Sequence, residues 1–248
     1  MTGEATARPL AQPDATAPIR ALPGARLIEV AGVPLAGLPE GVLWWAERRL
    51  MVVADLHLEK GSAFARRGQM VPPYDTVATL SALARVIERL DPRAVIALGD
   101  SFHDSAGADR LNDLDRAMLH RLQLGREWVW IAGNHDPDLP QGAGGERTAE
   151  ATIGPLLFRH EPQLGAAAGE IAGHLHPAAR VAGRAGSVRR KCFAADGARA
   201  ILPAFGAYAG GLNVLDAPFD GLFGANFIAF VLGAGSVYPV HRRRLTIG

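Results

Sequence analysis

Short runs of hydrophobic residues, separated by polar turns, fill the chain from residue 26 onward. The first runs lie at 26–33, 42–45 and 50–54, and each has the length of a single buried strand. The last two face each other across a short polar segment at 46–49, which is typical of a hairpin. This part of the chain therefore predicts one strand and then a β-hairpin whose second strand stops abruptly at Asp55.

The segment 75–90 has a different period. Its hydrophobic side chains recur at the three- and four-residue spacing that places them on one face of a helix. Asp75 stands where an N-cap is expected, because an aspartate side chain can accept a hydrogen bond from the free N–H groups of a first turn. Pro92 then ends the pattern, since proline cannot continue a helix. We predict a helix over 75–90.

A strand, a helix and another strand follow. Ala94–Leu98 is a continuous hydrophobic run, a second helix is predicted at about 109–124, and a further buried run covers 128–132. Strands that alternate with helices in this way favour right-handed crossovers and a largely parallel sheet. In such a sheet the carboxyl ends of the strands form the ligand crevice, so the residues that follow each strand are the candidates for chemistry.

After residue 146 the hydrophobic runs become shorter and follow one another without helical segments. This pattern is typical of antiparallel hairpins, with turns expected at 196–197 and 233–235. We therefore expect an α/β (α+β) protein in which two packed β-sheets carry helices on the outside, in a single domain. The strands of the second sheet are predicted near 147–153, 155–160, 169–173, 188–194, 199–203 and 226–232.

The composition agrees with a globular protein. Of the 248 residues, 48% are hydrophobic and 21% are charged, which allows a substantial core in one domain over 25–248. Residues 1–24 are rich in Ala, Pro and Thr and have little hydrophobic periodicity, so we expect a disordered tail there. No hydrophobic stretch approaches a membrane span, and the first residues lack the plan of a signal peptide. We expect a cytoplasmic protein with no membrane partner.

Charge and cysteine content add little to this picture. A net charge of +1 provides no overall attraction for polyanions, so any nucleic-acid affinity would have to come from local basic clusters. Such clusters occur at 66–67, 189–191 and 242–244, and each is also an ordinary solvated surface feature. The single cysteine, Cys192, cannot form an internal disulfide, which suits a reducing compartment.

The unusual polar residues stand directly after the predicted strands. Five short strings hold six of the eight histidines, together with aspartates and an asparagine. Packed imidazoles and carboxylates would repel one another or be left unsatisfied unless a cation compensates them, and a metal ion does so directly. The residues concerned are Asp55 and His57, Asp100 and His103, Asn134 and His135, His160, and His174 and His176.

The donor types and their spacing constrain the metal site. Residues i and i+2 of a strand point to the same side, so Asp55 with His57, and His174 with His176, are each expected to present two donor atoms to one point. Imidazole, carboxylate and amide ligands without a thiolate suit Mn, Fe, Zn or Co. Without His103 and His135, the list contains seven candidate ligands. One ion cannot use seven ligands and still leave a position free for substrate, so two divalent ions bridged by a carboxylate are predicted.

The order of these motifs resembles a known family. D-x-H, G-D, G-N-H-D, a lone histidine and G-H-x-H look like the five motifs of the calcineurin-like metallophosphoesterases. The longer strings "VVADLHLEKGSAFARRG", "ALGDSFHD", "WIAGNHDP", "EIAGHLHPAAR" and "LPAFGAYAGGLNVLD" closely resemble the bacterial DNA ligase-associated metallophosphoesterases, over about residues 26–240. The resemblance implies a four-layer αββα sandwich of two mixed β-sheets.

The resemblance also implies a role for each residue. His135, which follows a ligand without being one, is implied to be the general acid that protonates the leaving oxygen. Two metal ions, most often Mn in these relatives, would share Asp100. One ion would be held by Asp55, His57, Asp100 and His176, and the other by Asp100, Asn134, His160 and His174.

One position departs from the family pattern. Many relatives have G-D-x-x-D, whose last aspartate orients the catalytic histidine, whereas this chain has His103 there, followed by Asp104. Two interpretations of His103 are open. It contacts a phosphate oxygen or ester group and favours diesters, or it is a supporting histidine hydrogen-bonded to backbone. Asp136 is expected either to hydrogen-bond the turn or to orient His135.

The expected activity is hydrolysis of phosphodiesters by a metal-bound hydroxide, and the resemblance implies a DNA nuclease in a repair system. Its relatives are encoded with an ATP-dependent DNA ligase, a helicase and an exonuclease-like protein. Lys60, Arg66 and Arg67 are candidates for contact with the phosphate backbone, or are simply surface residues. Two roles are open for Phe64 and Tyr208: stacking on bases of the substrate, or packing in the core. The competing functions are hydrolysis of a small nucleotide or pyrophosphate, and a non-catalytic scaffold.

Overall fold

The computed structural model describes residues 17–138, 141–165, 168–183 and 186–247. The first sheet is mixed: its β1 to β4 edge is antiparallel and its β4 to β7 half is parallel. The parallel half is built by the predicted crossovers through α3 (Asp75–Leu90) and α5 (Asp113–Gln123). In spatial order the sheet consists of β1 (Arg26–Val30), β2 (Val33–Gly37), β3 (Leu43–Trp45), β4 (Leu50–Val53), β5 (Ala94–Leu98), β6 (Glu127–Ile131) and β7 (Glu146–Thr148).

The second sheet is also mixed. Strands β9, β10 and β13 run parallel to one another, whereas the remaining long pairs are antiparallel. Its main path is β14 (Leu212–Asn213), β11 (Pro177–Gly183), β12 (Gly186–Ala195), β13 (Arg199–Ile201), β10 (Glu170–Ala172), β9 (Leu156–Arg159) and β8 (Glu150–Ile153). Strand β15 (Ile228–Leu232) pairs with β12, and β16 (Val237–His241) pairs with β15.

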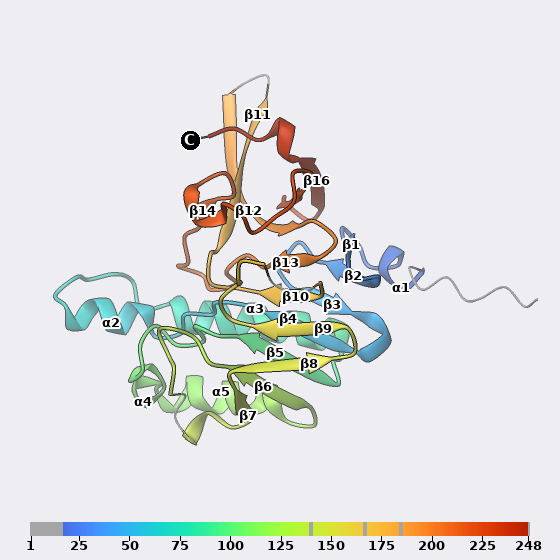
Figure 1. Ribbon diagram of the computed structural model, residues 1–248. Helices are drawn as coiled ribbons and strands as arrows, with labels where there is room; N and C mark the ends of the chain where they lie inside the picture. Colours follow the sequence, from blue (N-terminus) through green and yellow to red (C-terminus); the bar gives the residue numbers. More distant parts are fainter. Residues whose placement is uncertain (1–16, 139–140, 166–167, 184–185, 248) are drawn as a thin grey trace, which may run out of the picture.

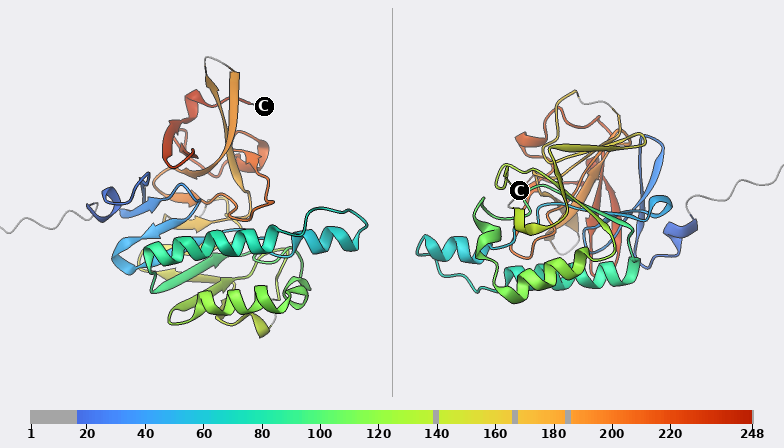
Figure 2. Two further views of the ribbon diagram at one scale, coloured as in Figure 1. Left: turned by 180° about the vertical axis from the view of Figure 1, so that it is seen from behind. Right: turned by 90° about the horizontal axis from the view of Figure 1, so that it is seen from below.

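The alternation of side chains along β4 shows how the layers are assembled. Met51 and Val53 pack under the helices α3 and α5, whereas Leu50 and Val52 face the second sheet, because successive residues of a strand point to opposite faces. In Figure 1 the strands of both sheets lie in front of the helix layer, and in the left view of Figure 2, seen from behind, α3 and α5 lie in front of the strands. The expected packing of two mixed sheets is confirmed.

The outer face of the second sheet is covered mainly by irregular chain. The segment that follows β14 packs Phe219, Leu222 and Phe227 onto this face, and its regular part is the 3-10 turn η3 (Ala217–Phe219). Three aromatic or aliphatic side chains supply the apolar area that a helix would otherwise bring. The fourth layer is therefore thin.

The predicted helix over 75–90 is present with the same bounds. Its cap differs from the expectation. Tyr74 is the N-cap residue, and Asp75 is the first helical residue, whose carboxylate instead accepts a hydrogen bond from the backbone N–H of Gly61 at 3.0 Å. The helix ends at Leu90 because Asp91 adopts a left-handed conformation, one residue before the proline.

Three other boundaries were wrong. The run at 26–33 forms two strands, because Ala31 and Gly32 both adopt positive φ and turn the chain back on itself. The expected helix at 109–124 is interrupted: α4 (Gly107–Arg110) ends early, and Asn112 caps α5 by accepting a hydrogen bond from the N–H of Asp115. The expected strand at 147–153 is divided between the two sheets as β7 and β8.

Some elements were missed, and one expectation about pairing was wrong. The antiparallel hairpins expected after residue 146 are replaced at the centre of the sheet by the parallel pairs β9–β10 and β10–β13. Hydrophobic periodicity does not reveal which strands pair, so this error is intrinsic to local patterns. The missed elements are α2 (Lys60–Arg66), β11, β14 and β16.

The expected tail at 1–24 begins to fold earlier than predicted. Helix α1 (Ala17–Arg20) lies within that range, and its Ile19 is buried in the core beneath the first sheet. Residues 1–16 of the expected tail lie outside the described residues. In the part of the chain that the structure describes, none of the helices combines the length and apolar character needed to cross a membrane.

Candidate metal centre

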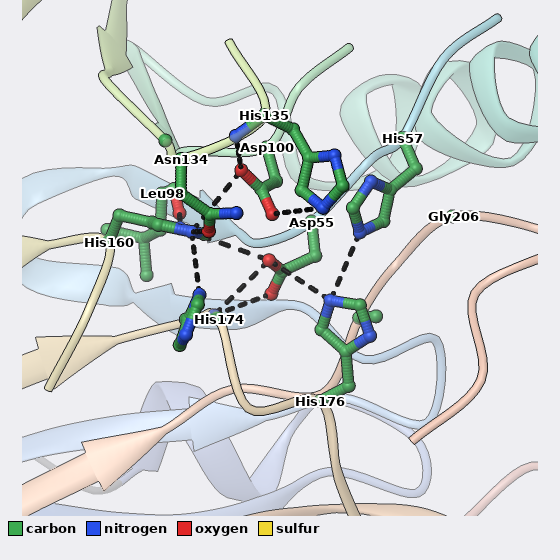
Figure 3. Close-up of polar contacts among 12 residues, drawn as sticks. Asp55, His57, Leu98, Asp100, Asn134, His135, His160, His174, His176 and Gly206 are labelled. Atoms are coloured by element: carbon green, nitrogen blue, oxygen red, sulfur yellow. Dashed lines mark hydrogen bonds and ion pairs between the residues drawn. The ribbon is translucent and has the colours of Figure 1, made fainter. Parts of the chain in front are cut away.

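The polar strings meet where the parallel strands of both sheets end. Asp55 and His57 follow β4, Asp100 follows β5, and Asn134 follows β6. From the second sheet, His160 follows β9, and His174 with His176 follows β10. Figure 3 shows these side chains pointing toward one another from opposite sheets. The structure thus brings together all seven residues that the sequence nominated as ligands.

The first group consists of Asp55, His57 and His176. One ligand atom from each lies within 4.8 Å of the others. Nε2 of His176 is 3.1 Å from Nε2 of His57 and 3.2 Å from Oδ1 of Asp55. Asp55 and His57 are almost fully buried, whereas His176 is half-buried. Two imidazole nitrogens and a carboxylate oxygen at such separations form three corners of a coordination sphere.

The second group consists of Asp100, His160 and His174, and it is equally close. Nε2 of His160 lies 3.3 Å from Oδ1 of Asp100 and 3.1 Å from Nδ1 of His174. Asn134 joins this group, because its Oδ1 is 3.0 Å from the same Nε2. Asp100 lies in this group, and the role of Asp100 as a ligand shared by both ions stays a prediction.

The donor set of the second group fits a metal ion. Nδ1 of His160 is 2.8 Å from the carbonyl oxygen of Leu98, and because a carbonyl only accepts, the proton of a neutral His160 ring is on Nδ1. Its Nε2 then carries a lone pair and faces the oxygens of Asp100 and Asn134, which carry lone pairs as well. Acceptors that converge in this way need a shared cation.

The electrostatics of the protein without metal lead to the same conclusion. Burial favours the neutral form of Asp100, but the hydrogen bond and charge of His160 outweigh it and lower the pKa of Asp100 to about 2. Burial would lower the pKa of His160, yet the hydrogen bond to Asp100 and the charges of Asp55 and Asp100 raise it to about 9. In the first group, burial and the neighbouring His176 lower the pKa of His57 to about 3. The second group thus holds a proton that an incoming metal ion must displace.

The backbone around the ligands is strained rather than extended. Asp55, His57 and Asp100 have φ values of 54°, 44° and 46°, and His174 and His176 have 68° and 46°. Non-glycine residues in this left-handed region cost about 1–3 kcal/mol each and are concentrated at functional sites. The packing of the two sheets therefore offsets the cost of this backbone conformation, which makes the ligand side chains converge.

This conformation corrects one inference from spacing. Asp55 and His57 do contribute to one group, as expected, but they do so from a left-handed turn and not from a strand. The expectation that His174 and His176 present their donors to one point is wrong, because the turn sends His174 to the second group and His176 to the first. Their division agrees with the assignment that the family resemblance implied.

Glycine directly precedes three of the ligands, and Gly99 and Gly133 show the steric reason. A Cβ atom on Gly133 would lie 2.3 Å from Oδ1 of Asp100, and a Cβ atom on Gly99 would lie 2.5 Å from the ring of His160. No side chain fits in either position. At Gly133 the need for glycine comes from this close approach, which lets the β5 and β6 strand ends pack against each other.

His135 stands at the open side of the centre. Its side chain is 41% exposed, and its Nε2 lies 3.9 Å from Oδ2 of Asp100. Its Nδ1 is 2.9 Å from the carbonyl oxygen of His103, so this carbonyl accepts a hydrogen bond from the ring and orients it. A backbone carbonyl thus has the orienting role that the family resemblance assigned to an aspartate. No sequence pattern could have identified it, because every residue carries a carbonyl.

The side chains around His135 are placed as follows. Asp104 does not contact the ring but forms an ion pair with Arg110 at 2.7 Å. The His103 ring stacks on His135, with centroids 5.3 Å apart, and on Phe64 at 5.6 Å. Burial and the charge of Lys60 lower the pKa of His103 to about 4, so the ring is neutral near pH 7.

The candidate substrate residues lie on or beside α2. The ammonium group of Lys60 donates a hydrogen bond to the carbonyl of Tyr208 and lies 5.9 Å from the centre of the Phe64 ring. Arg66 and Arg67 are exposed at the end of the same helix. Tyr208 is 38% exposed, so its ring is not part of the core. Its hydroxyl donates a hydrogen bond to the carbonyl of Pro72, which holds the ring in place.

Asp136 is a buried residue of the turn. Its carboxylate accepts hydrogen bonds from the N–H of Phe102 at 3.0 Å and of Gly133 at 3.2 Å, and so ties the two loops after β5 and β6 together. Of the two roles that the sequence left open, the structure supports the first. The carboxylate stabilises the turn, and the His103 carbonyl orients His135.

Asp136 is expected to make stability depend on pH. Burial raises its pKa to about 6. Because the folded-state pKa lies above the unfolded value, the folded protein binds this proton more tightly, and the stabilisation is lost as pH rises through the folded pKa. Asp136→Asn removes the titration. In chelator-treated protein, the free energy of unfolding of the wild type relative to Asp136→Asn is expected to fall by up to about 3 kcal/mol between about pH 4 and pH 7.

Urea unfolding at a series of pH values measures this difference, with Asp138→Asn on the exposed part of the same loop as the control. A stability difference between wild type and Asp136→Asn that does not change with pH would contradict the buried, proton-binding state of Asp136.

Comparison with known proteins places the chain in a family. A family model for calcineurin-like phosphoesterases matches residues 48–191, which is more than half of the chain. The chain belongs to this family. Members of the calcineurin-like phosphoesterases are metal-dependent hydrolases, and the two ligand groups described above imply that this phosphoesterase also uses divalent metal ions.

Solved structures extend the comparison beyond the matched segment. The crystal structure of the Pseudomonas putida nuclease MPE is similar with a TM-score of 0.67 and 29% identity, over 87% of this chain and 100% of that chain. Yfce, a phosphoesterase from E. coli, aligns at 14% identity with a TM-score of 0.39, over 77% of this chain and 97% of that chain. A search of curated proteins found no match.

Proposed function

We propose that this phosphoesterase is a nuclease that hydrolyses phosphodiester bonds of DNA with two divalent metal ions, of which Mn²⁺ is the most suitable. The observation that carries the proposal is the pair of ligand groups lying side by side, with the exposed His135 at their open side. The similarity to a nuclease over that protein's whole length supports a nucleic acid as the substrate, and the family resemblance of the sequence motifs favours DNA.

Each ligand residue has a proposed place. When bound, the two cations would neutralise the phosphate charge and activate a water molecule near neutral pH. The Leu98 carbonyl keeps the His160 ring in the tautomer that offers Nε2. We assign Asp55, His57 and His176 to one ion, Asn134, His160 and His174 to the other, and Asp100 to both.

His135 is assigned as the general acid. Its Nδ1–H donates to the His103 carbonyl, so in the protonated ring Nε2 is the nitrogen that can give up a proton. That atom faces Asp100, and the open side of the ring is accessible to a substrate. A proton delivered from Nε2 to the leaving oxygen completes the bond cleavage without a free alkoxide.

The wall beside His135 suits a nucleotide diester. His103, neutral and stacked between Phe64 and His135, has an Nδ1 atom without a hydrogen-bond partner among the described residues. We assign this ring to the second ester group of the substrate. Lys60, whose charge acts on His103, is assigned to a phosphate oxygen, and Arg66 and Arg67 extend the positive charge along α2.

A role in DNA repair with an ATP-dependent ligase, a helicase and an exonuclease-like protein is part of the proposal, and the family resemblance supports it. Scaffold members of such families are expected to have lost ligands, whereas this chain keeps the whole set close together. Retention of all seven ligands therefore favours an enzyme over a binding module.

Metal removal and substrate choice test the function together. Chelator-treated protein is expected to lose turnover of a nitrophenyl phosphodiester and to regain it with Mn²⁺, with about two ions bound per chain by elemental analysis. Single-stranded, duplex and nicked DNA, cyclic dinucleotides and phosphomonoesters are then compared under the same conditions. Exclusive turnover of a small nucleotide would overturn the DNA substrate, and absence of both metal and turnover would support a scaffold.

A further inference from the structure

Two basic segments that are far apart in the sequence lie side by side in the structure. Residues 177–195 contain five Arg or Lys residues and no Asp or Glu, and residues 237–248 contain three consecutive arginines and no acidic residue. The first segment forms the hairpin β11–β12. The second carries the 3-10 turn η4 (Arg242–Arg244). This concentration of positive charge contrasts with the net charge of +1 for the whole chain.

Specific contacts hold the second segment against the hairpin. Val181 of β11 forms a bridge with Leu245, and the N–H of Thr246 donates to the carbonyl of Arg180 at 3.0 Å. The amide of Asn213 donates to the carbonyl of Thr246 at 2.9 Å. In Figure 1 and in the left view of Figure 2, the hairpin projects beyond the other strands of the two sheets, and the C-terminal segment lies beside it.

The hairpin register orders its cations along one face. Arg180 pairs directly with Arg189, and Lys191 lies two residues further along β12, so all three side chains leave the same face. Residues two apart on a strand are separated by about 6.6 Å, which lets each cation contact a different anionic group. The hairpin thus carries a row of positive charges and not a single point of charge.

This row begins at the metal centre. The Lys191 ammonium donates hydrogen bonds to the carbonyls of Ala204 and Gly206, and the negative charge of Asp55 favours its charged form. The Arg189 guanidinium donates to the carbonyl of Gly211, in the segment packed against the backbone of His176. Arg180 lies beside Arg189 on the neighbouring strand. A guanidinium has five donors, so these single bonds leave most of the hydrogen-bonding capacity of Arg189 available.

We propose that the basic hairpin surface, defined as Arg180, Arg189 and Arg242–Arg244, binds the phosphate backbone of a DNA strand and leads it to the metal centre. The inference rests on the proposed function for the substrate class and adds the surface that holds DNA outside the reacting group. A row of arginines without acidic neighbours matches a polyanion of regular charge spacing.

Salt dependence tests this surface. Binding of a fluorescein-labelled 20-base-pair DNA duplex is measured by anisotropy in EDTA, where cleavage is absent. Because each phosphate contact contributes about 0.9 to the slope of log K against log salt, Arg180→Gln/Arg189→Gln is expected to lower the slope by about two units. Over a fourfold rise in salt, this corresponds to about tenfold less loss of affinity than in the wild type.

The pair Arg242→Gln/Arg243→Gln does not contact the ligand-bearing turns and provides an independent test with the same expected change. Arg180→Lys/Arg189→Lys keeps the charge and is expected to keep the slope. The matched control is Arg85→Gln/Arg121→Gln, which removes two exposed cations from the helix layer on the opposite side of the molecule. With metal restored, the ratio of kcat/KM for DNA to that for a nitrophenyl diester is expected to fall in the two surface variants and to stay constant in the control.

The outcomes separate this inference from the proposed function. Wild-type slopes in both surface variants, or an equal loss in the control, would overturn the basic hairpin surface even if DNA is cleaved. A surface used for an acidic protein partner would leave the DNA slopes unchanged and give that same result. Conversely, DNA that binds with the expected slopes but is never cleaved would overturn the nuclease and leave the surface in place.

Discussion

Asp100→Asn is expected to remove the metal ion from the second ligand group and to reduce phosphodiester hydrolysis at least about 100-fold. Replacing a residue that merely orients a metal ligand already lowers metal affinity or activity by about 10–100-fold. Asp100 is expected to provide a ligand oxygen itself. Asparagine keeps the volume and can keep the hydrogen bond from the N–H of His135 to Oδ1, but it removes the charge that attracts the cation. The His103 carbonyl still orients His135.

Metal stoichiometry and turnover are measured together for this variant. Asp109→Asn is a suitable control, because this carboxylate is exposed on α4, which follows the same strand end. Thermal unfolding of the metal-free proteins shows whether the variant folds. Full metal content with wild-type turnover in Asp100→Asn would contradict the assignment of this residue to the metal centre.

His135→Ala is expected to slow hydrolysis of a poor leaving group by about 10²–10⁴-fold, the usual contribution of a general acid. An alkyl or nucleoside leaving oxygen needs the proton, whereas a nitrophenolate leaves without one. The loss on a nitrophenyl diester is therefore expected to be much smaller. Steady-state rates on the two substrates, at equal metal loading, measure the difference. Equal losses on both would remove the acid role.

His103→Ala provides the comparison within the same site. The carbonyl that orients His135 belongs to the backbone and survives this substitution, so the leaving-group dependence of the wild type is expected to persist. If the His103 ring contacts the second ester group, diesterase activity falls more than monoesterase activity. A proportional fall in both would show that the ring only packs between Phe64 and His135.

The sequence alone identified which side chains could carry the chemistry. Asp55, Asp100, Asn134 and His160 each follow a hydrophobic run, and the ends of buried strands can be recognised from local residue patterns. The helix over 75–90 was recognised for the same reason, since its period is a property of sixteen neighbouring residues. The metal type was narrowed by the absence of thiolate ligands, which composition reveals directly.

Other features depended on contacts between distant residues. The parallel pairing of β9, β10 and β13 depends on which strands become neighbours. The same is true of the close approaches that leave no room for a side chain at Gly99 and Gly133. The division of His174 and His176 between two groups follows from a left-handed turn that local periodicity would describe as strand. The carbonyl that orients His135 has no residue identity to detect.

The sequence by itself therefore determined the inventory of the site, because residue type and local spacing decide which groups can bind a cation or transfer a proton. Only the tertiary structure decided their geometry and their surroundings. Asp136 turned out to be a buried acceptor for two loops, and the C-terminal segment that carries η4 came to lie against the hairpin. Both results depend on long-range packing, whose free energy is shared among many residues and is not encoded in any single segment.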